Sequence, residues 1–232
     1  MKTSELFKTE LDYIKIDILK EITKRTLDDA PSCFKVIPAS SSGKYHPMYA
    51  IKRGSEFNGL VDAGGLVLHT KAAVNIAHSV MQTKYFDDVL YNFFNRAVSL
   101  DGIAKVKAVY MDIVYAALLC HDTQKPDDTP QHNTRFDHPI EAVKAWLKNA
   151  NIVLDEYYPL GSSEKERKRI DLVNVVARCI GSHMGEWNKS NYSDVVLPTP
   201  ADSLAQFVHL CDFLASRRFL EFDFRAFAEV GR

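Results

Sequence analysis

The stretch Val114-Tyr-Ala-Ala-Leu-Leu-Cys-His121-Asp122-Thr-Gln-Lys125 joins an apolar run to an abrupt polar end. The run predicts a buried helix that delivers an imidazole, a carboxylate and, three residues on, an ammonium group. Removing an imidazole and a carboxylate from water side by side is costly unless something compensates, and a divalent metal compensates well. The alternative is a helix C-terminus whose polar residues simply face water.

The composition is that of an ordinary globular protein. Of the 232 residues, 46% are hydrophobic and 25% are charged. The formal net charge of -1 neither attracts nor excludes nucleic acid. No segment approaches the roughly 20 uninterrupted apolar residues that a membrane span requires, so we expect no membrane contact. The charged, periodic N-terminus lacks the apolar block of a signal peptide, and we therefore expect a cytoplasmic protein.

The cysteines show no CxxC spacing, and three of the four lie in apolar helical runs. This pattern indicates buried, reduced thiols and argues against disulfides or a thiolate zinc site. The residues concerned are Cys33, Cys120, Cys179 and Cys211.

The N-terminal part predicts one helix followed by a long connection. Residues 4–27 carry apolar residues at helical spacing, and Ala30-Pro31 ends this helix. Residues 31–65 are dominated by serine, glycine and proline, which predicts a connection. Within it, Ser40-Ser-Ser-Gly43-Lys44 has two interpretations: a set of backbone N–H groups with an ammonium for a phosphate, or a mobile solvated loop.

Gly64-Gly65 opens the next predicted helix, which carries two histidines. His69 and His78 are nine residues apart, and at about 100° per residue they lie on opposite faces. At most one of them can serve a central site. His69 follows three apolar residues and is the better candidate, whereas His78 is expected to be structural or solvated.

Helical patterns continue on both sides of the opening stretch. Residues 84–99 are aromatic-rich, and their stripe indicates core packing; residues 103–120 form the apolar helix that ends at His121. After a loop rich in Pro and Asp, His138-Pro139 opens another helix. His138 at this position either points inward or serves as a capping or surface residue.

Two more helices complete the pattern. Ser163-x-x-Glu166 is a capping-box sequence for a helix that runs to just before His183. Thr199-Pro200-x-Asp202 predicts another start, with proline at the first helical position. Asp212 follows in an apolar run, where a carboxylate should be paired, metal-bound or on an exposed stripe. His209, three residues earlier, is a candidate hydrogen-bond partner of Asp212.

We expect a single all-α bundle of roughly seven to nine helices, because no strand pattern is longer than a few residues. The expected divisions are a helix and loop extension (1–60), a central helical domain (61–220) and a C-terminal tail (221–232). The tail is aromatic and acidic, and it either packs on the core or forms a homo-oligomer contact.

Histidines and aspartates recur at helix ends or on inward-facing runs. Imidazoles mixed with carboxylates suit Mn, Fe, Co, Ni, Zn or Mg, and a closed structural zinc site is not expected without thiolates. Each residue alone has an ordinary structural explanation, but five helices each contributing one is harder to explain without a metal. The candidate ligands are His69, His121, Asp122, His138, His183 and Asp212.

This order resembles the HD superfamily of metal-dependent phosphohydrolases. The similarity covers about residues 60–218, and its motifs are GGLVLHT ending at Thr70, LLCHDTQK ending at Lys125, HP at 138–139, GSHMG at 181–185 and LCDFLAS ending at Ser216. The branch with a GGxxxHT motif and a late Gly-x-His is similar to HD domains of 3'–5' exoribonucleases that act on short oligonucleotides. The ordered set is fairly specific for the superfamily and poorly specific for substrate.

The resemblance implies an HD-domain-like bundle with one metal bound by His69, His121, Asp122 and Asp212. His138 and His183 match the additional histidines of the two-metal members, in which the aspartate equivalent to Asp122 bridges. Two divalent ions are therefore expected. His132 is the alternative to His138, because it lies six residues earlier in the same loop.

The expected reaction is hydrolysis of a phosphoester bond in a nucleotide or short oligonucleotide, through a water that bridges two cations and readily loses a proton. Lys125 would stabilise a non-bridging oxygen or the leaving group, or else it is a solvated helix-end lysine. Weaker candidates for a second phosphate or a base are Lys44, Tyr45, His46 and Arg217.

Two other classes of function remain open. A nucleotide-binding regulatory module would use an HD fold without turnover, and loss of a ligand would favour it; every ligand position that can be matched is filled. A helical scaffold with coincidental histidines would bind no metal.

Overall fold

The computed structural model describes residues 1–39, 64–126, 135–158 and 164–217, and side chains in all of these except 164–170. Its elements are η1 (Thr3–Phe7), α1 (Lys8–Leu11), α2 (Asp17–Asp28), η2 (Ser32–Lys35), α3 (Gly65–Met81), α4 (Lys84–Phe93), α5 (Leu100–Cys120), α6 (His138–Tyr157), α7 (Glu164–Gly181), η4 (Gly185–Trp187) and α8 (Ser203–Ser216). Eight α-helices and no strand occur in these ranges, so the predicted all-α class with seven to nine helices is confirmed.

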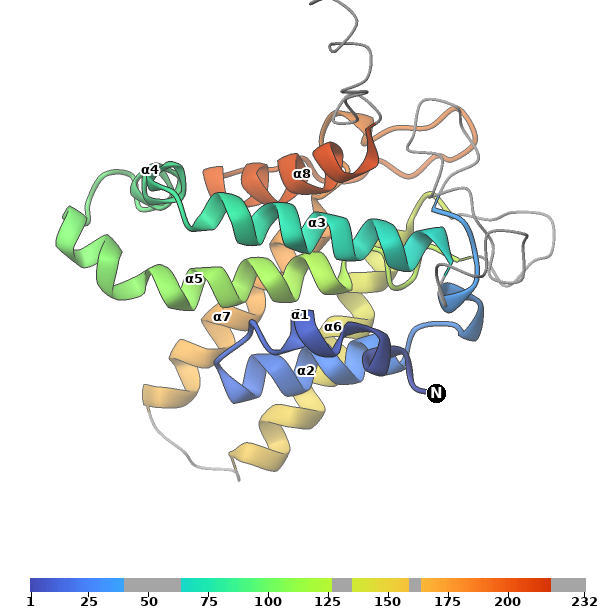
Figure 1. Cartoon of the computed structure of the whole chain (residues 1–232), viewed down its shortest axis with the longest axis horizontal. Coiled ribbons are helices and arrows are strands. Elements are labelled where there is room, and N and C mark those ends of the chain that lie inside the picture. The colour runs from blue at the N-terminus through green and yellow to red at the C-terminus, as the bar shows by residue number, and fades with distance from the viewer. Residues whose placement is uncertain (40–63, 127–134, 159–163, 218–232) are drawn as a thin grey trace, which may run out of the picture.

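Helix α5 lies at the centre of the bundle. It contacts α2, α3, α4, α7 and α8, and Figure 1 shows it running alongside α3. In that view α8 lies above α3, and α2, α6 and α7 lie below α5. The run 113–120 is buried throughout, as the apolar sequence predicted. The polar end of α5 is therefore delivered into the interior and not to the surface.

The prediction of one continuous helix over 4–27 is wrong. The structure has η1 and α1, then an irregular segment at 12–16, then α2. The cause lies far away in sequence: Asp112 of α5 accepts backbone hydrogen bonds from Lys15 N (2.9 Å) and Ile16 N (2.8 Å). Two backbone donors directed at a carboxylate of another helix cannot belong to a continuous N-terminal helix.

Helix α2 belongs to the same hydrophobic core as the rest of the bundle. It packs on α5 and α6, and its Ile18, Leu19 and Ile22 are buried. The expected division at residue 60 stays a prediction. Gly64 lies where the connection meets α3, and a Cβ there would come within 2.6 Å of the Ile37 carbonyl oxygen, so this close approach requires glycine.

Two predicted helix boundaries are also wrong. The helix expected over 84–99 ends at Phe93, because Asn95 and Arg96 adopt left-handed backbone angles with φ of 50° and 62°. The next helix begins earlier than residue 103, at Leu100, where the Ser99 side chain accepts a hydrogen bond from Gly102 N.

The start of α8 differs from the prediction as well. Asp202 is the N-cap, and its carboxylate accepts a hydrogen bond from Ala205 N at 2.9 Å, so Pro200 lies before the helix and not at its first position. The capping box predicted from Ser163 lies outside the described side chains, although α7 does begin at Glu164.

All four cysteines are free, as predicted, and Cys120, Cys179 and Cys211 are buried, whereas Cys33 is only partly buried and the prediction of burial is wrong there. Among the described residues, no helix combines the length and apolar character that crossing a membrane would need.

Candidate metal centre

Six predicted ligands from five segments meet in the interior. His69 lies on α3, His121 and Asp122 directly follow α5, His138 is the first residue of α6, His183 follows α7, and Asp212 lies on α8. The side chains of the first five are at most 3% exposed, and that of Asp212 is 18% exposed. Their nitrogen and oxygen atoms form three overlapping groups in which all ligand atoms lie within 4.8 Å of one another.

One part of the cluster surrounds His69 and His121. His69 Nε2 lies 2.9 Å from Asp212 Oδ1, and His121 Nε2 lies 3.5 Å from the same oxygen. Asp122 Oδ2 is 3.7 Å from His69 Nε2 and 3.4 Å from His121 Nε2. Two imidazole nitrogens and two carboxylate oxygens therefore face a common point.

The other part lies at the second oxygen of Asp122. Oδ1 is 3.1 Å from His138 Nε2 and 3.5 Å from His183 Nε2. The two histidine nitrogens are themselves 3.2 Å apart. Asp122 thus directs one oxygen to each pair of histidines.

Backbone carbonyls orient three of the four rings. His121 Nδ1 lies 2.7 Å from the Leu118 oxygen, His138 Nδ1 2.7 Å from the Arg135 oxygen, and His183 Nδ1 2.8 Å from the Ile180 oxygen. A carbonyl oxygen can only accept, so each Nδ1 must carry a proton and donate. In the neutral ring, each Nε2 then presents its lone pair to the cluster, which is the arrangement of metal-ligating histidines.

The charges in the cluster shift several pKa values. Burial disfavours ionisation of Asp122, but Lys125 and His121 outweigh burial and hold its pKa well below the usual range. Asp212 is held low in the same way by His121 and His69. Burial also opposes protonation of His121, yet Asp122 and Asp212 raise its pKa to about 10, so a proton can take the place of a cation there. Metal binding would have to displace it.

His138 behaves in the opposite way. Burial lowers its pKa to about 4, and the nearby Asp122 carboxylate does not reverse this. A ring that resists protonation, beside a carboxylate and a second imidazole, is a suitable ligand for a cation. The thiols next to the cluster are less suitable, because burial raises the pKa values of Cys120 and Cys211 and keeps the sulfurs protonated. The buried His and Asp groups could therefore hold a metal ion.

The weaker candidates have other places. Lys125 Nζ lies 2.8 Å from Asp122 Oδ2, and its side chain is 21% exposed, so it reaches the edge of the cluster. The Arg217 guanidinium lies over the rings of Trp187 and Phe213. The remaining candidates lie outside the described residues: Lys44, Tyr45, His46 and His132.

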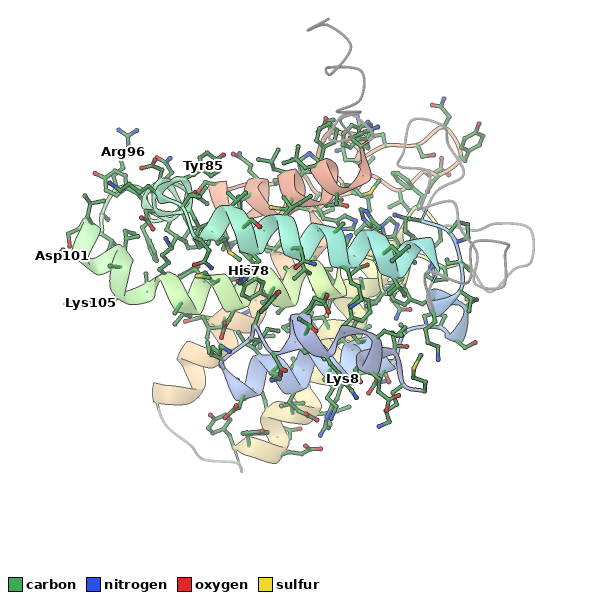
Figure 2. The ribbon with its side chains drawn as sticks, in the orientation of Figure 1. Lys8, His78, Tyr85, Arg96, Asp101 and Lys105 are labelled. Carbon is green, nitrogen blue, oxygen red and sulfur yellow. The ribbon has the colours of Figure 1, made fainter. Side chains whose placement is uncertain are left out.

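Two histidines outside the cluster show how far spacing predicts position. His78 Nδ1 pairs with the Tyr115 hydroxyl at 2.8 Å and its ring stacks on Tyr13, which agrees with the predicted structural role; Figure 2 labels His78 on α3. The prediction for His209 as partner of Asp212 is wrong. Its Nδ1 lies 2.6 Å from the His183 carbonyl oxygen and its Nε2 lies 3.1 Å from Glu186 Oε2, because the turn after α7 packs against this face of α8.

The residues that orient the ligands were not predicted. Leu118, Arg135 and Ile180 each precede a ligand histidine by three positions and act through their backbone oxygens. The common spacing is visible in the sequence, but side-chain identity carries no signal for it. Comparisons with protein-family models, with curated proteins and with solved structures found no match to this chain.

Proposed function

We propose that the chain is a metal-dependent phosphohydrolase of the HD superfamily that cleaves a phosphoester bond of a nucleotide or short oligonucleotide. Two features support this. The ordered motifs from His69 to Asp212 resemble that superfamily, and the same residues converge from five segments into one buried cluster. We assign the cluster to catalysis, because so many buried imidazoles and carboxylates in one place are costly unless a function retains them.

One observation carries the metal assignment. His138 and His183 both use Nδ1 as a donor to a backbone oxygen, and their Nε2 atoms lie 3.2 Å apart. Two lone pairs at this distance repel unless a proton or a cation lies between them. Burial lowers the pKa of His138 to about 4, which disfavours the proton. Asp122 Oδ1, 3.1 Å from His138 Nε2, has no hydrogen-bond partner among the described residues. His138 Nε2, His183 Nε2 and Asp122 Oδ1 would all be satisfied if they held a divalent cation.

The two oxygens of Asp122 support two ions. Oδ2 faces His69 and His121, whereas Oδ1 faces His138 and His183. We infer that Asp122 is shared, with Asp212 completing the first set. Imidazole with carboxylate suits Mn, Fe, Co, Ni, Zn or Mg, and the donor set alone does not select one of them. When bound, such ions lower the pKa of a coordinated water and neutralise charge on phosphoryl oxygens.

The residues of the chain then have distinct roles. Asp122 holds the two histidine pairs in register, and its burial excludes bulk water from both of its oxygens. Lys125, now paired with Asp122 Oδ2, is placed to hold a non-bridging phosphoryl oxygen or the leaving group. Asp212 is the most exposed ligand, so substrate would enter on the side of α8.

The test combines metal content with hydrolysis. The purified chain, reconstituted with Mn²⁺, would be offered dNTPs, nucleoside monophosphates, cyclic dinucleotides, bis-p-nitrophenyl phosphate and short RNA and DNA oligomers. We expect two metals per chain and turnover of at least one substrate, with both lost in Asp122→Ala. His78→Gln is the matched control, because His78 lies on α3 with His69 but pairs with Tyr115, and it should keep both properties.

The other outcomes discriminate between classes of function. Bound metal without turnover of any nucleotide or phosphodiester would contradict the enzyme and favour a catalytically silent nucleotide-binding regulatory module. A chain that binds no metal after reconstitution would contradict the metal centre itself.

A further inference from the structure

A group of aromatic and charged side chains lies directly beside the cluster and is not used by it. Trp187 ends η4, four residues after the ligand His183, and Phe213 follows the ligand Asp212 on α8. Their rings stack with centroids 5.3 Å apart and planes inclined by 14°. We call these two rings, together with the Arg217 guanidinium that lies over both of them, the aromatic stack. Its two rings come from the same two segments that supply ligands to the two parts of the cluster.

His209 holds the stack against the ligand turn. Its ring lies 5.7 Å from that of Trp187, and its Nδ1 donates to the backbone oxygen of His183 at 2.6 Å. Gly185, with φ of +59°, makes room for this ring, since a Cβ there would clash with the His209 imidazole. His209 therefore contacts both the Trp187 ring and the backbone of the candidate ligand His183.

Packing alone does not explain the exposure of Trp187. Its side chain is 39% exposed, whereas the other tryptophan, Trp146, is fully buried and donates Nε1–H to the Val173 oxygen. Tryptophan gains much from burial, so a large ring that packs on Phe213 yet stays partly exposed beside the candidate metal cluster is a suitable binding surface.

Charge indicates what kind of group would bind. The Arg217 guanidinium carbon lies 4.9 Å from the Trp187 ring centre and 4.7 Å from that of Phe213. A cation held against these rings adds positive potential beside the partly exposed Trp187 side chain. A planar ring attached to an anionic phosphate complements both features, since the ring can stack and the phosphate is attracted to the cation.

We propose that Trp187 is the stacking surface for the base of a nucleotide whose phosphate lies at the cluster, and that the aromatic stack selects nucleotides over phosphate esters without a base. This inference rests on the proposed phosphohydrolase function for the placement of the phosphate. Stacking on an aromatic side chain tolerates every base, so the selection is for a base as such and not for one of the four.

Trp187 also supplies the signal for the test, because the chain has two tryptophans and the other is buried. Fluorescence of the full chain would be titrated with AMP, GMP, CMP and UMP, and with ribose 5-phosphate as the ligand without a base. The four nucleotides should quench the emission and ribose 5-phosphate should not.

Substitution of Trp187 tests the same surface by calorimetry. Trp187→Leu should reduce nucleotide affinity about 5- to 100-fold, and Trp187→Phe should have an affinity between those of Trp187→Leu and the parent. Tyr192→Ala, at a 98% exposed ring in the same connection, should bind as the parent does.

The outcomes separate this proposal from the previous one. Nucleotide binding that depends on Trp187 without any turnover would leave the stacking surface standing and contradict the phosphohydrolase. Turnover with unchanged nucleotide affinity and KM in Trp187→Leu would contradict the stacking surface alone. Equal affinity for ribose 5-phosphate and AMP, or no binding of any nucleotide, would also overturn it. Circular dichroism of each variant checks that the helices are intact.

Discussion

At the scale of single residues, the position of a proton decides what the cluster can bind. Three of the candidate ligand rings donate Nδ1–H to a backbone oxygen, so only Nε2 of each can interact with the cluster. The same ring type does something different at His209, whose two nitrogens face an oxygen of the backbone and an oxygen of Glu186. Residue type alone would not separate these cases.

The pairing of two histidines with each oxygen of Asp122 predicts how the metal content responds to substitution. His138→Gln should remove about one of the two expected ions, because it alters only the pair at Asp122 Oδ1. His69→Gln should remove the other, and Asp122→Ala should remove both, because each oxygen of Asp122 serves one pair. Elemental analysis of the reconstituted variants gives the stoichiometry. If Asp122→Ala kept one full ion, Asp122 would not be shared.

At the scale of elements, the contact between α5 and the segment before α2 decides how the N-terminal region folds. Asp112 Oδ2 accepts both Lys15 N and Ile16 N, and the residue is only 3% exposed. Burial raises the pKa of Asp112, and the two backbone hydrogen bonds only partly oppose this. The carboxylate is therefore kept for its geometry, at some cost from its charge.

Asp112→Ala should lower the free energy of unfolding by about 1–3 kcal/mol, because two backbone donors lose their acceptor. Asp112→Asn keeps an acceptor oxygen and removes the buried charge, so its stability at neutral pH should equal or exceed that of the parent. Urea unfolding followed by circular dichroism measures both. A loss in Asp112→Asn as large as that in Asp112→Ala would show that the charge itself is needed.

The stability difference between the parent and Asp112→Asn should change with pH in a definite direction. A carboxyl whose pKa is raised by folding favours the folded state most below its unfolded pKa of 3.8, and this contribution is lost as pH rises through the folded value. Relative to the parent, Asp112→Asn should therefore gain stability between about pH 3.5 and pH 7. A constant difference across this range would contradict the raised pKa.

At the scale of the whole molecule, the cluster joins elements that are distant in sequence. The candidate ligands come from α3, the end of α5, α6, the turn after α7, and α8, so ions held there would tie five segments together. Burial of so many lone pairs and carboxylates is unfavourable without compensation. Metal binding and global stability should consequently be linked.

Chelation should reveal this linkage. A ligand at about 100 times its dissociation constant adds about 2.7 kcal/mol, which for a chain of this size corresponds to a Tm change of about 5–10 °C. EDTA should lower Tm by this order in the parent and by much less in Asp122→Ala. Differential scanning calorimetry with and without EDTA measures both. An equal decrease in the two proteins would assign the effect to something other than the cluster.

Much of the fold was predictable from local pattern. Apolar periodicity predicted the helical class and the buried run before His121, because a helix must bury one face whatever its partners are. Histidines and aspartates at the ends of or within apolar runs stand out in sequence for the same reason, whereas His138, which follows a polar loop, had an equally good interpretation as a capping residue. Their roles as ligands, the HD-superfamily assignment and the substrate stay predictions.

What tertiary structure alone decided depends on contacts between distant residues. The break at 12–16 exists because Asp112 lies opposite it, and the role of His209 exists because the turn after α7 lies against α8. Asp122 Oδ1 and Oδ2 face different histidine pairs only because four separate segments bring those rings together. The sequence by itself determined which apolar runs would be buried and that histidines and aspartates would accompany them, since burial follows local periodicity. Partner choice was left to the packed bundle, because hydrogen bonds and metal sites depend on distances of a few ångströms that only packing sets.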